Sequence, residues 1–84
     1  MKRDLKGWGP FAVHMMPEDR RACLRCLRTI LSLLYGSRAG QVMDLVRRAE
    51  DDGDLLAPAC AALTALPEAD RRRIVMAYAA VEVG

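Results

Sequence analysis

The stretch that decides the fold runs from Pro17 to Tyr35 and reads PEDRRACLRCLRTILSLLY. Proline is favoured at the first position of a helix, and the two acidic residues after it complement the positive end of the helix dipole. Gly36 follows the last apolar residue and supplies a stop signal. The apolar positions cover more than half of the helical circumference, so we expect a central helix that packs on two or more sides.

Signals for three further helices follow in the chain. Ser37 is the expected cap of a second helix, which ends at the acidic turn of residues 50–54. Asp54 is the expected cap of a third helix over about 55–65, and a fourth begins at Pro67. The sequence therefore predicts an all-α fold, a compact bundle of about four short helices with an irregular N-terminal arm.

The first sixteen residues are expected to form this arm. Gly7, Gly9 and Pro10 interrupt any helix there, and the next proline biases Met16 away from helical angles. The domain organisation that follows is an arm over 1–16 and a helical domain over 17–84.

Trp8 and Phe11 give the arm two aromatic side chains that need a place in the fold. In one interpretation the arm folds back and staples the first helix. In the other these two residues anchor a partner, because buried aromatic side chains dominate the energetics of interfaces. Arg21, Arg25 and Arg28 follow the polar face of the first helix and would form the charged rim of that contact.

Length and composition limit the classes of protein that fit. The 84 residues make one domain, of which 52% are hydrophobic. A chain this short is near the lower limit for a stable single core, so a homodimer or a complex with another protein is a possible state. A net charge of +2 identifies no class of partner. Eleven of the thirteen basic residues are Arg, which together with the abundant Ala indicates a GC-rich bacterial or phage genome.

The ends and the cysteines of the chain indicate a compartment. The basic N-terminus is not followed by the apolar run of a signal peptide, and no stretch reaches about 18 uninterrupted apolar residues, so we expect no membrane partner. Three cysteines, an odd number, fit reduced thiols better than a disulfide framework. A cytoplasmic location is expected.

A zinc site is the one metal hypothesis that the composition offers. His14, Cys23, Cys26 and Cys60 are together a complete ligand set for tetrahedral zinc. However, Cys23 and Cys26 fall within the apolar pattern of a helix, where a cysteine usually serves as a small hydrophobic residue. We therefore expect neither a metal nor a cofactor.

Catalytic signatures are absent from the sequence. His14 is the only histidine, and no serine or threonine lies in a nucleophile motif. No glycine-rich loop of the kind that cradles phosphates is present either. We expect that the chain is not an enzyme.

The remaining hypothesis is binding. We expect a small protein-interaction module, such as a phage or bacterial inhibitor or adaptor that docks on a larger protein complex. The alternative is a small dimeric transcriptional regulator that binds nucleic acid through an Arg-rich helix surface. Its candidate contacts are Arg47, Arg48, Arg71, Arg72 and Arg73.

Overall fold

The computed structural model describes Leu5 and residues 7–83, and within these residues the chain forms helices and no strand. Four α-helices follow one another along the chain: α1 (Pro17–Tyr35), α2 (Gly40–Ala49), α3 (Leu56–Thr64) and α4 (Glu68–Val83). The radius of gyration of the Cα atoms is 11.6 Å, as expected for a compact domain of this length. The predicted all-α bundle of about four short helices is confirmed.

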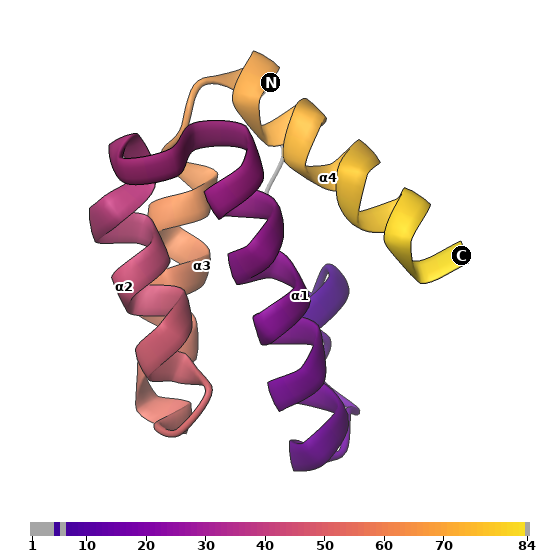
Figure 1. The fold of residues 1–84 in the computed structure, drawn as a ribbon. Coiled ribbons are helices and arrows are strands. Elements are labelled where there is room, and N and C mark those ends of the chain that lie inside the picture. Colours follow the sequence, from indigo (N-terminus) through magenta and orange to yellow (C-terminus); the bar gives the residue numbers. More distant parts are fainter. Residues whose placement is uncertain (1–4, 6, 84) are drawn as a thin grey trace.

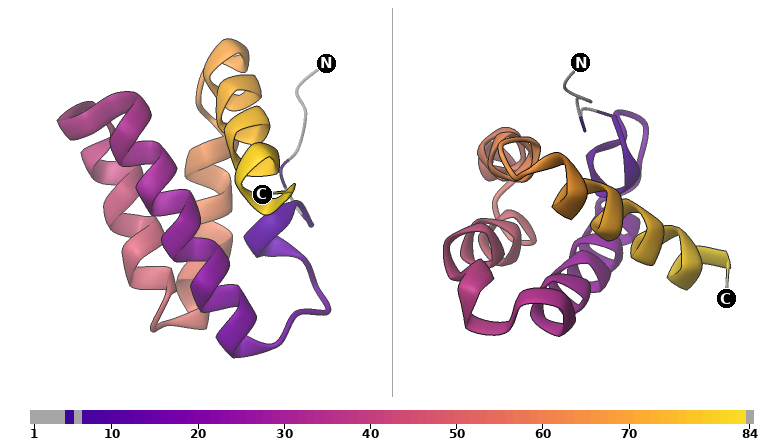
Figure 2. Two further views of the ribbon diagram at one scale, coloured as in Figure 1. Left: turned by 45° about the vertical axis from the view of Figure 1, so that its right-hand side comes forward. Right: turned by 90° about the horizontal axis from the view of Figure 1, so that it is seen from above.

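The first three α-helices lie side by side and run up, down and up in Figure 1. The fourth helix runs obliquely across α1 and extends beyond it, as the view from above in Figure 2 shows. The described part of the N-terminal arm includes a short 3-10 turn, Gly9–Phe11, that packs against α1. Residues 1–4 and 6 of the predicted arm lie outside the described residues.

The central position of α1 follows from its apolar pattern. Leu24, Leu27 and Leu31, spaced at i, i+3 and i+7, are almost completely buried, and Ile30 is buried as well. The helix begins at Pro17 and ends at Tyr35, as predicted. Gly36 follows with a φ of 56°, a left-handed conformation that glycine adopts without steric cost, and its N–H bonds to the carbonyl of Ser32.

The start of α2 differs from the prediction. The segment Gly36–Ala39 is a 3-10 turn, and Ser37 lies within it instead of capping the helix. The N-cap is Ala39, which has no side chain that could accept a hydrogen bond. The N–H of Gly40 bonds to the backbone carbonyl of Ser37, because the 3-10 turn leads directly into the helix and supplies backbone acceptors.

The cap before α3 also differs from the prediction. The N-cap of α3 is Leu55, which makes no side-chain cap bond, and Asp52 instead caps the preceding turn, where its Oδ1 accepts a hydrogen bond from the N–H of Asp54 at 3.0 Å. This bond starts a 3-10 turn, Gly53–Leu55, that leads directly into α3. Pro58 is the third residue of α3, where its missing N–H costs no helical hydrogen bond.

The arm contributes to the core. Leu5 and Phe11 are buried together with the apolar faces of the helices. The ring of Trp8 contacts the ring of Tyr78, a residue of α4 that is almost completely buried. Gly9, with a φ of 48°, permits this approach, since a Cβ atom there would lie 3.2 Å from the Tyr78 ring. No helix in the described part of the chain has the length and apolarity needed to cross a bilayer.

Candidate functional site

The two predicted aromatic anchors differ in exposure. Phe11 is 9% exposed and belongs to the core, so contact with a partner would require it to leave the fold. Trp8 is half-buried, with its ring centroid 4.9 Å from that of Tyr78 and 6.4 Å from that of Phe11. Trp8 therefore keeps part of its surface accessible while it holds the arm against α4.

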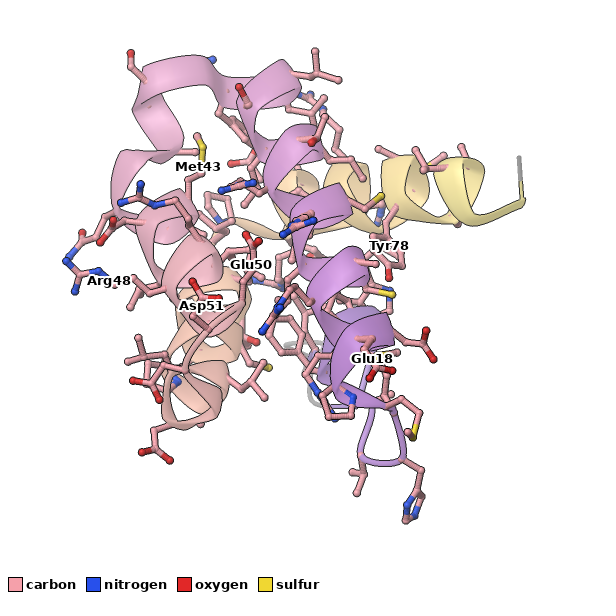
Figure 3. The ribbon with its side chains drawn as sticks, turned by 60° about the horizontal axis from the view of Figure 1, so that its bottom comes forward. Glu18, Met43, Arg48, Glu50, Asp51 and Tyr78 are labelled. Carbon is pink, nitrogen blue, oxygen red and sulfur yellow. The ribbon has the colours of Figure 1, made fainter. Side chains whose placement is uncertain are left out.

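The predicted arginine rim contacts the end of α2. The Nε of Arg25 donates to Oε1 of Glu50 at 3.2 Å, and Nη1 of Arg28 lies 3.5 Å from the other carboxylate oxygen. The Nε of Arg21 donates to the backbone carbonyl of Glu50 at 3.2 Å. Figure 3 shows Glu50 between α2 and α1. These three arginines therefore complement the negative end of α2 and join it to α1.

The five arginines of the nucleic-acid alternative are dispersed over two helices. Arg47 and Arg48 both pair with Asp44 at 3.1 Å, and Arg72 lies 3.7 Å from Glu68. Arg71, by contrast, is buried.

The burial of Arg71 has a structural explanation. Its Nη1 donates to the backbone carbonyl of Thr64 at 3.0 Å and to that of Leu66. Carbonyl groups at the end of a helix lack partners within the helix, so this guanidinium completes the C-terminal end of α3. Arg71 is therefore not exposed to a phosphate backbone in this structure.

The residues of the zinc hypothesis do not come together. Within Leu5 and residues 7–83, no three His, Cys, Asp or Glu side chains are grouped as metal ligands would be. Cys23 and Cys26 are half-buried on α1, Cys60 is half-buried on α3, and His14 is exposed in the arm.

A cavity that the sequence did not predict lies where the end of α1 meets the start of α2, the turn after α3 and the first turns of α4. Its volume is about 330 Å³. Four apolar residues and four polar residues line it: Leu31, Ala39, Val42, Leu66, Tyr35, Arg38, Asp70 and Arg73. The cavity thus combines an apolar lining with two guanidinium groups, one carboxylate and one phenol.

Arg38 and Arg73 differ from the other arginines that the structure describes. Both are exposed, and neither forms an ion pair or a hydrogen bond with another described residue. The other described arginines each bond to a carboxylate or a backbone carbonyl: Arg20, Arg21, Arg25, Arg28, Arg47, Arg48, Arg71 and Arg72. The two described arginines that have no bond to another described residue therefore line the same cavity.

Tyr35 and Asp70 complete the polar lining of the cavity. The hydroxyl of Tyr35 donates to the backbone carbonyl of Asp70 at 3.4 Å. Burial raises the pKa of this hydroxyl above its usual value, and the adjacent Asp70 raises it further, whereas Arg73 and Arg38 act in the opposite direction. At neutral pH Tyr35 is therefore an uncharged hydrogen-bonding group.

A sequence signal for half of this site exists. Arg38 has no acidic residue three or four positions away on either side, so helical pairing offers it no partner. Arg73, in contrast, has Asp70 three residues earlier, and only the fold shows that the two side chains form no ion pair. The convergence of Arg38 and Arg73 on one cavity depends on tertiary structure.

Comparisons of the chain with protein-family models, with curated proteins and with solved structures found no match.

Proposed function

We propose that this chain is a small, non-enzymatic protein-interaction module, an inhibitor or adaptor of bacterial or phage origin that docks on a larger protein complex in the cytoplasm. The observation that carries the proposal is the position of Arg38 and Arg73 beside one partly apolar cavity. Arginine is enriched in binding hot spots, and the buried centre of an interface is more apolar than its rim.

The same observation favours the cavity over the contact surface expected from the sequence. Arg21, Arg25 and Arg28 already bond to the end of α2, and a partner would have to compete with Glu50 for them. Arg38 and Arg73 have no such bonds to other described residues, so a partner gains their interaction without displacing one. Trp8 remains a second candidate contact through the accessible part of its ring.

Affinity capture tests the proposal. Tagged protein is incubated with lysate of the organism that encodes it, with and without nuclease, and bound proteins are identified by mass spectrometry. We expect a stoichiometric protein partner that survives nuclease and is lost in the double variant R38Q/R73Q.

The matched control is the double variant R47Q/R48Q. It removes the same charge from a face where both arginines are already paired with Asp44. We expect it to retain the partner. Loss of binding in both double variants together with nuclease sensitivity would instead support the nucleic-acid regulator, whose affinity also falls steeply with salt. Light scattering on the purified chain measures whether it forms a homodimer.

A further inference from the structure

The chemistry of the cavity indicates a class of ligand, and this inference rests on the proposed function. Leu31, Ala39, Val42 and Leu66 form its apolar lining. Leu31 and Ala39 are buried, so the half-buried Val42 and Leu66 supply most of the accessible apolar surface. Burial of an apolar side chain against such a lining stabilises a complex in proportion to the area removed from water. An occupant should therefore carry one apolar group.

The size of the cavity limits that occupant. About 330 Å³ is at the lower end of the range for ligand pockets. A single amino-acid residue fits within such a volume, whereas a whole helix, about 10–12 Å across with its side chains, does not. The occupant is therefore expected to be a chain end or a single side chain.

The charges beside the cavity favour one carboxylate. A guanidinium group binds a carboxylate through two parallel hydrogen bonds, and Arg38 and Arg73 have no carboxylate partner among the described residues. Asp70 also lines the cavity and offsets one of the two guanidinium charges, so a single carboxylate is enough to neutralise the site. Its carboxylate is also a good acceptor for a peptide N–H.

We propose that the cavity binds the C-terminal residue of a partner polypeptide. The terminal carboxylate binds to Arg38 and Arg73, the apolar side chain enters the cavity, and the N–H of that residue faces Asp70. A chain terminus combines these three groups within one residue, and capture of a terminal carboxylate is an established mode of peptide recognition.

Two probes test the proposal on the full chain by NMR titration. One is N-acetyl-leucine, and the other is a hexapeptide of alternating glycine and serine that ends in leucine. Each is used as the free acid and as the C-terminal amide. We expect both acids to shift the signals of Leu31, Val42 and Leu66, with a Kd on the order of 1 mM for N-acetyl-leucine.

The amides and the variants test the role of the charges. We expect the amides to bind at least about tenfold more weakly, and R38Q/R73Q to weaken binding of the acids by a similar factor. R47Q/R48Q should bind the acids as the unmodified chain does. Because Arg38 and Arg73 are exposed and form no hydrogen bond or ion pair with a described residue, R38Q/R73Q is not expected to unfold the protein.

Four results would overturn the inference. Equal binding of acids and amides would show that the carboxylate is not recognised, and shifts confined to residues outside the cavity would exclude the site. Binding of N-acetyl-leucine without binding of the hexapeptide would identify a site for a free small acid.

The titration and the capture experiment also separate the two proposals. If no acid binds but R38Q/R73Q still loses the captured partner, this inference fails while the proposed function stands. If the acids bind and no protein is captured, the proposed function fails.

Discussion

Oε1 of Glu50 accepts a hydrogen bond from Nε of Arg25 at 3.2 Å and thereby connects the end of α2 with the middle of α1. The other oxygen of the same carboxylate lies 3.5 Å from the guanidinium of Arg28. The side chain of Glu50 is only 7% exposed, whereas most other paired carboxylates of the described chain lie at the surface. This ion pair is therefore less screened by solvent than those around it.

Replacing Glu50 by Gln should destabilise the protein by about 1–2 kcal/mol, because the two guanidinium groups lose their counter-charge in a partly buried site. Urea denaturation measures the change. Asp44→Asn is the matched control, since Asp44 also pairs with two arginines but is 40% exposed. Its expected loss is below about 0.5 kcal/mol. Equal losses would show that burial of Glu50 adds nothing.

Replacing Arg71 by Met should cost about 2–3 kcal/mol, because the carbonyls of Thr64 and Leu66 lose a charged donor at the end of α3. Met keeps most of the apolar volume, so the loss reports the polar contacts. The neighbouring Arg72→Met variant should change stability by less than about 0.5 kcal/mol, since Arg72 is exposed and forms one long ion pair. Thermal unfolding distinguishes the two, and a stable Arg71 variant would contradict the proposed capping role.

Replacing Gly9 by Ala should loosen the packing of the arm on α4, because the new Cβ would lie 3.2 Å from the Tyr78 ring and one of the two groups must shift. The residue also has a φ of 48°, which disfavours any side chain by about 1 kcal/mol. Gly7→Ala carries a similar φ penalty but meets no atom within 4 Å. The difference between the two variants in the fluorescence of Trp8 isolates the clash with Tyr78. No difference would mean that the ring moves aside without cost.

Replacing Trp8 by Ala tests whether this residue packs the arm or anchors a partner. Loss of the half-buried Trp8 ring, which contacts Tyr78, should lower the free energy of unfolding by about 1–3 kcal/mol. We expect the helical circular dichroism signal to persist, because the described helices do not include Trp8. Retained folding with loss of the captured partner would support an anchor, whereas retained capture would limit Trp8 to packing.

Tyr35 predicts a dependence of stability on alkaline pH. Its pKa in the folded protein is raised, first by burial and then by Asp70, so the folded state holds this proton more tightly than the unfolded state. The resulting stabilisation is complete below about pH 10, the usual pKa of tyrosine, and is lost as the pH rises through the higher folded value. Tyr35→Phe should remove this part of the alkaline loss, which denaturant titrations at several pH values measure. An unchanged pH profile in the variant would contradict the assignment.

The sequence by itself determined the local structure wherever one short segment carried the whole signal. Pro17, the two acids after it and Gly36 define α1 to the residue, because helix start and stop signals act within a single turn. The caps at Ser37 and Asp54 were wrong for a related reason. Before α2, a 3-10 turn supplies a backbone acceptor in place of the Ser37 side chain. Before α3, the Asp52 side chain caps the 3-10 turn in place of Asp54. Which of several nearby groups caps a helix depends on the path of the chain into it.

Only the tertiary structure decided what the charged residues do. Arg71 and Arg73 belong to one run of three arginines, yet Arg71 is buried at the end of α3 and Arg73 lines the cavity without an ion pair to a described residue. Likewise, the rim predicted on α1 lies against Glu50, far along the chain. The period of a helix determines which face a residue occupies, whereas the crossing of α1 and α4 and the turn before α2 determine what that face meets.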